Sequence, residues 1–255
     1  MLKSGDKSKI FIMGPSFGVS IWNYSSLLSH FIRNYVRMQD KHVISVRYFL
    51  QDYLYTNYRR LRYDKFIKSG VVDDEYCFSL STLWYDNLAD RTTNRYRGIF
   101  TKACATTFKN FEGGFFYIPS KNVEREFEEY HKYKEEYKDL LIYKRISMAT
   151  YLKKIKKSVL VFNTQSVCGC LGWKLPEFLA MGKCIISTPL DKEMPGEFLP
   201  GKHYFLVSNM DEIAIAIQYL KEHREVRERL EQNSKAYFDQ YLSPTAVISR
   251  LIAAL

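Results

Sequence analysis

Strand-like and helix-like stretches alternate regularly along this chain from about residue 75 to its end. The predicted strands are 75–84, 111–118, 140–146, 159–164, 183–188 and 203–208. The predicted helices are 94–105, 123–139, 148–158, 174–182, 212–223, 225–242 and 245–255. This alternation is typical of α/β folds in which helices connect parallel strands, and "VLVFNT" (159–164) is apolar enough to be buried on both faces. We therefore expect an α/β fold with a parallel, Rossmann-type sheet.

Three residues mark where helices of this pattern begin or end. Ser147 and Asp211 precede two predicted helices, and short polar side chains at that position accept hydrogen bonds from the first turn. Gly182 follows a third, where a glycine commonly ends a helix. We expect helices to start after Ser147 and Asp211 and to stop at Gly182.

The first part of the chain differs from the rest. It has strand-like runs at 9–14 and 42–50, followed by a stretch rich in Tyr and Arg that fits no clear pattern. We expect a smaller N-terminal α/β unit at 1–72 and a larger unit at 73–255, whose last helix packs back on the N-terminal unit.

Composition limits the class of protein. The 255 residues are 46% hydrophobic and 26% charged, as in ordinary soluble globular proteins. There is no run of 18 apolar residues and no signal-peptide pattern at the N-terminus, so we expect a cytoplasmic protein. The five cysteines show no zinc-binding spacing, and no metal is expected.

The net charge of +10 allows three partners: nucleic acid, an anionic membrane surface, or a phosphorylated substrate. Much of the charge lies in stretches such as 130–139, where acidic and basic residues alternate at helical spacing, as on a solvated helix face. No nucleic-acid-binding signature is present, so no nucleic acid is expected as a partner. Charge alone does not decide between the partners.

The segment "SVCGCLGWKLPEFLAMGKCIIS" (166–187) carries the strongest functional signal. The strand before it should end at the carboxyl edge of the sheet, where ligands of such folds collect. The loop then supplies small residues, and Lys174 and Glu177 lie in the first turn of the next helix, where an anion is favoured. A glycine-containing loop and an early glutamate are also common without any ligand, so both interpretations remain open from these residues.

The longer run at 158–190 resembles the nucleotide-sugar-binding half of GT-B-fold glycosyltransferases, and "PEFLAMGKCII" carries the closest match. The resemblance extends over about 140–250. It implies that Glu177 holds the ribose of the donor. The retaining branch has a second glutamate eight positions earlier, where this chain has Gly169, which leaves the donor sugar and the stereochemical outcome open.

The same resemblance assigns further donor-binding residues. Basic residues near the start of the helix at 94–105 would contact the diphosphate, and the segment 143–147 would hold the base. The expected donor-binding set is Arg95, Arg97, Arg145, Gly172, Trp173, Lys174 and Glu177. For any one arginine, an exposed structural position is the alternative.

Sugar transfer also needs a base to accept the proton of the acceptor, and Asp73, which neighbours Asp74, is the residue predicted for that role. The alternatives are Asp52, Glu75, His30 and His42. The expected activity is metal-independent transfer of a hexose or pentose, in glycan biosynthesis, from a nucleotide-diphosphate sugar to a glycan or lipid-linked acceptor. Contact with an anionic membrane face would be compatible with the charge. The alternative is a non-catalytic basic nucleotide- or nucleic-acid-binding α/β protein.

Overall fold

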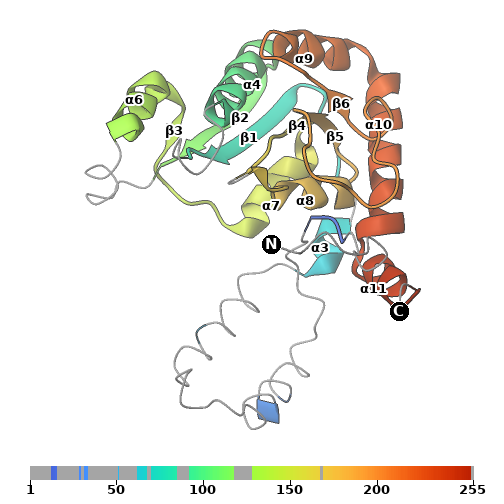
Figure 1. The fold of residues 1–255 in the computed structure, drawn as a ribbon. Helices are drawn as coiled ribbons and strands as arrows, with labels where there is room; N and C mark the ends of the chain where they lie inside the picture. The colour runs from blue at the N-terminus through green and yellow to red at the C-terminus, as the bar shows by residue number, and fades with distance from the viewer. Residues whose placement is uncertain are drawn as a thin grey trace, which may run out of the picture.

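The computed structural model describes residues 13–15, 29, 32–33, 51, 62–67, 70–84, 92–117, 128–166 and 169–253 (Figure 1). The predicted strands at 9–14 and 42–50 and most of the predicted unit at 1–72 lie outside the described residues. The predicted domain boundary therefore stays a prediction.

Within the part of the chain that the structure describes, six strands form the sheet region, and every pairing among them is parallel. The strands are β1 (Tyr76–Thr82), β2 (Asn110–Phe116), β3 (Leu141–Ile142), β4 (Leu160–Asn163), β5 (Cys184–Ser187) and β6 (Phe205–Leu206). They pair in the orders β1-β2-β3 and β4-β5-β6. The Val159 amide donates to the Tyr76 carbonyl at 3.0 Å, which places β4 beside β1. The strand order is thus that of the Rossmann fold, as predicted.

The helices of the described residues cover both faces of this sheet (Figure 1). They are α3 (Tyr63–Ile67), α4 (Thr93–Thr107), α6 (Glu128–Glu136), α7 (Met148–Lys157), α8 (Lys174–Ala180), α9 (Glu212–Glu222), α10 (Arg224–Tyr237) and α11 (Pro244–Ala253), with short helical turns η3 (Lys138–Leu140) and η5 (Phe238–Leu242). In α9 the buried residues follow helical spacing: Ile213, Ala216, Ile217 and Leu220.

All three predicted helix ends are confirmed, since α9 also begins directly after Asp211. The Ser147 hydroxyl accepts the Thr150 amide at 3.1 Å at the start of α7, and Gly182 follows α8 with φ +60°. Asp211 precedes α9, but its side chain makes no capping bond. Asn209 caps instead, because its side-chain oxygen accepts the Glu212 amide at 3.1 Å.

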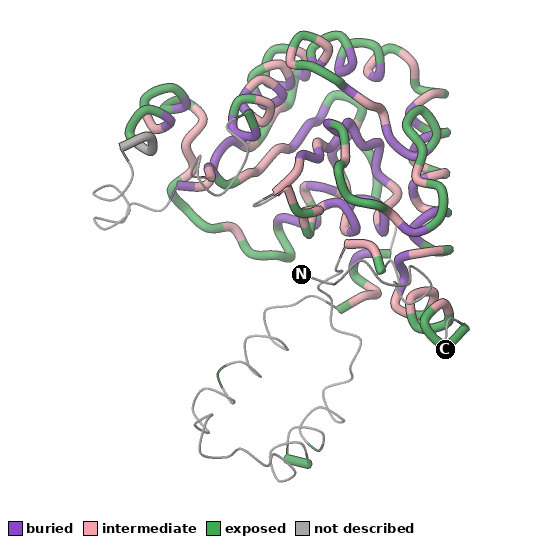
Figure 2. Tube along the Cα trace, viewed as in Figure 1, coloured by how far each residue is buried: buried purple, intermediate pink, exposed green. Residues whose placement is uncertain are grey.

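Two predicted strands are much shorter than expected. The stretches 140–146 and 203–208 contribute only the two-residue strands β3 and β6, because these lie at the outer edges and pair with one neighbour each. The central strands match the prediction, and β5 is buried at all four positions (Figure 2).

The core is split by the sheet into two layers. Side chains such as Phe78, Val161 and Ile185 pack with α7, α8 and α10. Side chains such as Cys77, Leu160 and Ile186 face the other way, towards α4 and α9. Successive residues of one strand enter opposite layers, as the period of two requires.

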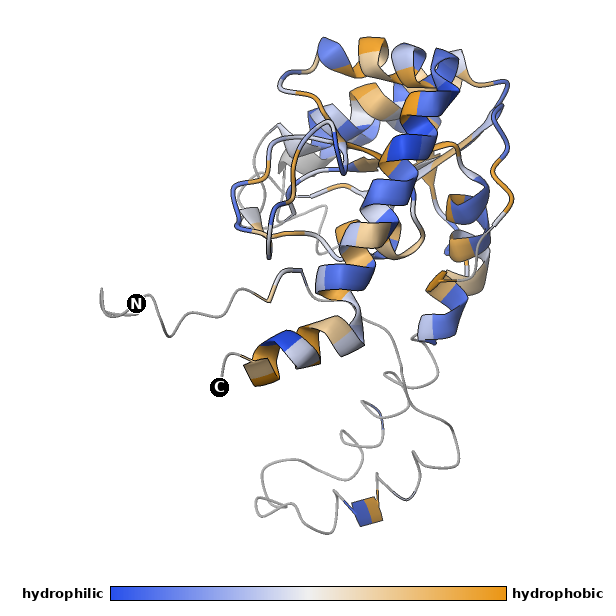
Figure 3. Cartoon of the chain, turned by 90° about the vertical axis from the view of Figure 1, so that its right-hand side faces the viewer, coloured by the Kyte–Doolittle hydropathy of each residue, from blue (hydrophilic) through white to orange (hydrophobic). Residues whose placement is uncertain are grey.

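The last helix, α11, extends from the end of η5 (Figure 3). Its Ile248 and Ile252 side chains are 55% and 65% exposed. The predicted packing of this helix on the N-terminal unit falls on residues that the structure does not describe. Among the described helices, none is long and apolar enough to cross a membrane.

Candidate functional site

The strands of the described ranges are parallel, so their carboxyl ends lie at one edge of the sheet. The loops after β1 and β4 leave the sheet there, and α4 and α8 begin nearby. The start of α4 is fixed by Asn94, whose side-chain amide exchanges two hydrogen bonds with the Trp84 backbone, at 3.0 and 2.7 Å. These two hydrogen bonds hold helix α4 against the end of β1 and so set the position of the side chains on its second turn.

Arg97 lies on that second turn and reaches across the edge of the sheet. Its guanidinium donates to the Thr82 carbonyl at 3.1 Å, to the Thr164 hydroxyl at 2.9 Å and to the Gln165 carbonyl at 3.5 Å. Burial lowers the pKa of Arg97 to about 10, so the group stays charged at neutral pH. The side chain joins the end of β1 to the loop after β4.

Lys174, the first residue of α8, lies at the same place. Its ammonium donates to the Leu80 carbonyl at 2.5 Å and contacts the Ser81 hydroxyl at 3.4 Å. Burial lowers the pKa of Lys174 to about 7, and the charge of Arg97 adds to the decrease. Among the described residues, no carboxylate forms an ion pair with Arg97 or Lys174. Both side chains donate their hydrogen bonds to neutral acceptors.

Glu177 is one turn further along α8 and is half-buried. Burial raises the pKa of its carboxyl to about 7, although the Lys174 charge opposes the increase. The Glu177 charge in turn acts on Tyr151 of α7. Arg97, Lys174 and Glu177 thus form one cluster, which we call the edge cluster.

The loop before α8 is built around a glycine turn. Gly169, at the position of the missing glutamate, has φ +66°, a conformation that glycine tolerates best. Gly172 is not among the glycines with a positive φ, and an added Cβ there would make only an ordinary contact, with the Ser166 Cβ at 3.7 Å. Trp173 is 67% exposed, so its ring is available to a ligand.

The structure places the two other predicted donor-binding arginines differently. Arg95 is exposed, and its charge acts on Tyr137 on the other side of α4. Arg145 is also exposed and lies 5.5 Å from the centre of the Phe116 ring, at the carboxyl end of β2. Arg145 therefore shares the edge of the sheet with the cluster, whereas Arg95 points away from it.

Asp73 lies at the opposite edge of the sheet. It precedes β1, accepts the Glu75 amide at 3.0 Å and pairs with Lys157 at 3.1 Å. These partners lower the pKa of its carboxyl, with the Glu75 amide contributing most. The whole length of β1 separates Asp73 from the edge cluster, so its position does not favour the predicted role as the base.

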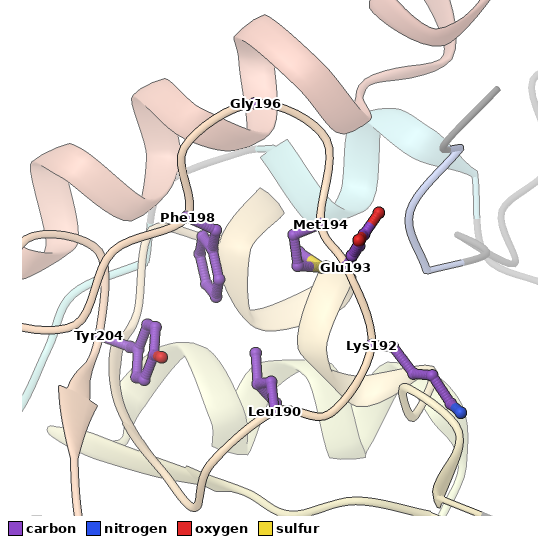
Figure 4. A pocket seen from close by; sticks show the side chains of 7 residues that line it. All are labelled: Leu190, Lys192, Glu193, Met194, Gly196, Phe198 and Tyr204. Carbon is purple, nitrogen blue, oxygen red and sulfur yellow. The ribbon is translucent and has the colours of Figure 1, made fainter. Parts of the chain in front are cut away.

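A pocket of about 460 Å³ lies under the loop between β5 and β6 and was not foreseen from the sequence. Figure 4 shows Leu190, Met194, Phe198 and Tyr204 directed into it, with Lys192 and Glu193 at the rim. The Gln165 side chain donates to the Pro189 carbonyl at 3.4 Å, which ties this loop to the loop after β4. In sequence, the only signal is an alternation of Pro, Gly and aromatic residues at 189–204.

Two solved structures with TM-scores of at least 0.50 show the same fold. TarM is 11% identical with a TM-score of 0.51, and the alignment covers 74% of this chain and 37% of TarM. A variant of S. aureus TarM in complex with fondaparinux, α-GlcNAc-glycerol and UDP is 10% identical with a TM-score of 0.50, covering 73% and 36% of the two chains. Anabaena HepE in complex with UDP is 13% identical with a TM-score of 0.47, covering 71% and 50%. This chain therefore spans about a third to a half of the length of these proteins.

Sequence comparison identifies the family. A search of curated proteins found no match. The model of the family described as glycosyl transferase-like matches residues 109–253, which is more than half of the chain. The parallel sheet, its strand order and this match agree, and the chain belongs to the glycosyl transferase-like family, with a GT-B glycosyltransferase fold.

Proposed function

We propose that the protein binds a nucleotide-diphosphate sugar at the edge cluster and transfers the sugar to a glycan or lipid-linked acceptor. The observation that carries this proposal is the pair formed by Arg97 and Lys174. Two half-buried cations lie together here: the charge of Arg97 lowers the pKa of Lys174, and among the described residues neither cation forms an ion pair with a carboxylate, so an anion is favoured at this site. A diphosphate supplies that anion.

Each member of the edge cluster then has a role. Arg97 and Lys174 neutralise the diphosphate and stabilise the charge that develops on it as the sugar leaves. Glu177 accepts hydrogen bonds from the ribose hydroxyls, and the segment around Arg145 receives the base. Since two cations are already in place, we propose that the diphosphate needs no metal ion.

The relatives indicate which ligands to test first. The S. aureus TarM variant was solved with UDP and with saccharide ligands. We therefore propose a uridine nucleotide as the first probe of the donor site and saccharides as the acceptor class, with GDP and ADP as alternative nucleotide probes.

Calorimetry with UDP, GDP, ADP and a single-stranded RNA tests the proposal. We expect at least one nucleoside diphosphate to bind and RNA to bind only weakly, with an affinity that disappears at high salt. Salt-sensitive RNA binding without any nucleotide binding would contradict the proposal and favour a non-catalytic nucleic-acid-binding protein.

Arg97→Gln should weaken binding of the nucleoside diphosphate about 10-fold, because a hydrogen bond between charged groups contributes roughly 1.5 kcal/mol or more. Arg229→Gln is the matched control, since it removes the same charge from an exposed position on α10. Calorimetry of both variants measures the difference. Equal affinities in the two variants would remove Arg97 from the site.

Removal of metal ions should leave nucleotide binding unchanged. The expected result is that an excess of EDTA changes the dissociation constant of the nucleoside diphosphate less than about twofold, which is within the usual scatter of such measurements. A large loss in EDTA that added Mg²⁺ or Mn²⁺ restores would show that a metal ion carries part of the charge.

A further inference from the structure

Tyr151 has a hydroxyl group that the packing of the protein does not explain. It lies on α7, is 8% exposed and belongs to the core layer between α7 and α8. Its ring packs edge-on against Phe78, with 5.9 Å between the ring centres. A phenylalanine would make the same ring contacts, so packing alone does not call for the hydroxyl.

The Tyr151 hydroxyl is buried and has no hydrogen-bond partner among the described residues. Leaving a buried polar group unpaired is costly, and native structures rarely do so without a functional reason. The pKa of the hydroxyl is raised well above its usual value, chiefly by burial, so the group keeps its proton and acts as a donor. A donor of this kind needs an acceptor close by.

The surroundings of Tyr151 point to the edge cluster. Tyr151 and Lys174 line one small cavity of about 10 Å³, together with Ser81 at the end of β1. The charge that acts on the hydroxyl is that of Glu177, one turn along α8 from Lys174, and it raises the pKa further. Ser79 also lines this cavity, and its hydroxyl is hydrogen-bonded to that of Thr101 at 3.3 Å. The apolar side chains of the lining, such as Leu80 and Phe178, accept no hydrogen bond.

We propose that Tyr151 is a positioning residue for Glu177: on nucleotide binding, its hydroxyl donates to the Glu177 carboxylate and turns the other carboxylate oxygen towards the ribose hydroxyls. This inference rests on the proposed function of the edge cluster. Tyr151 itself touches neither the sugar nor the diphosphate. It acts through Glu177, on the ribose part of the ligand alone.

Tyr151→Phe is the test, with the tightest-binding nucleotide among UDP, GDP and ADP and its 2′,3′-dideoxy counterpart as probes. The variant should bind the ribonucleotide about three- to tenfold more weakly, as expected for the loss of one hydrogen bond. It should bind the dideoxy nucleotide as well as the wild type does. Tyr151→Phe should also add no further loss when Glu177 is already alanine.

Tyr237→Phe is the control. Its hydroxyl donates to the Pro195 carbonyl at 2.6 Å, so this variant loses a hydrogen bond that exists without ligand. It should melt about 2–4 °C lower than the wild type and bind nucleotide normally. Tyr151→Phe should show the opposite pattern, with weaker binding and a melting temperature equal to or higher than that of the wild type, because it removes an unpaired buried hydroxyl.

The outcomes separate the two hypotheses. If the wild type binds none of the nucleotides, the proposed function fails and the positioning role fails with it. If the wild type binds and Tyr151→Phe binds equally well, only the positioning role is overturned. An equal loss for the ribonucleotide and the dideoxy nucleotide would also overturn it, because the effect would not pass through the ribose.

Discussion

Gly113→Ala should leave little folded protein. Gly113 is in the middle of β2, which is paired on both sides, and lies opposite Ser79 of β1. Its φ is +133°, a region that residues with a Cβ scarcely enter. A Cβ built on this glycine would lie 1.8 Å from the Ser79 carbonyl oxygen, which is backbone and has no free direction to move.

The expected cost is a large part of the total stability. Backbone strain in such a region costs about 1–3 kcal/mol, and a clash with the neighbouring strand adds to it. Domains of this kind are stable by only about 5–15 kcal/mol. Urea unfolding of the purified variant, or its absence from the soluble fraction, measures the effect.

Gly201→Ala is the matched control for this prediction. Gly201 also has a positive φ, +75°, but an added Cβ would have no atom within 4 Å. This variant should lose only about 1 kcal/mol, the strain of a left-handed residue. Similar unfolding midpoints for the two alanine variants would show that the sheet can move to accommodate the Gly113 side chain.

Gly113 also shows which features of the fold can be predicted from the sequence. "FEGGFFYI" predicts a strand, and β2 is there, because a local pattern of aromatic residues suffices to indicate it. The reason for the two adjacent glycines is not local. Gly113 meets the Ser79 carbonyl and Gly114 the Leu140 carbonyl, and both contacts arise only when the sheet assembles.

The candidate site was predictable to the extent that it is local. Lys174 and Glu177 lie within one turn of α8, a helix that the preceding glycine-containing loop predicts, and the structure brings them together. Arg95 and Arg97 carry the same charge two positions apart, and only the docking of α4 on the sheet decides which one faces the edge.

Asp73 and Tyr151 show two different limits of prediction from the sequence. Asp73 precedes its strand, and in a parallel sheet a residue before a strand lies at the amino edge, so the direction of β1 already argued against its placement at the site. The sequence does not indicate a functional role for Tyr151, because a tyrosine on the apolar face of a helix has the pattern of a core residue. Only the missing partner of its hydroxyl distinguishes it.

Lys174→Met should cause the largest loss of ligand binding, about two orders of magnitude at pH 7, because it removes a half-buried charge whose hydrogen bond to a diphosphate contributes up to roughly 3 kcal/mol. Methionine keeps the apolar stem of the side chain, so α8 should dock as before. Lys153→Met, at an exposed position on α7, removes the same charge away from the site and should bind normally.

The pH dependence of binding gives a second, independent measure. A nucleotide sugar is the right probe, since its diphosphate is esterified at both ends and does not change charge near neutral pH. The pKa values of both Lys174 and Glu177 lie at about 7 in the free protein. Binding requires the charged form of each: the ammonium for the phosphates and the carboxylate for the ribose.

The signs of the two titrations then fix the profile. As the pH falls below about 7, Glu177 gains a proton and the ribose loses its acceptor; as the pH rises above about 7, Lys174 loses a proton and the diphosphate loses a charge. The affinity of the wild type should therefore peak near neutral pH and fall on both sides, with Arg97 charged throughout and Tyr151 neutral throughout. Lys174→Met should lose the alkaline decline and keep the acidic one, whereas Glu177→Gln should do the reverse. A flat profile in the wild type, together with equal affinities of Lys174→Met and Lys153→Met, would separate the edge cluster from the nucleotide altogether.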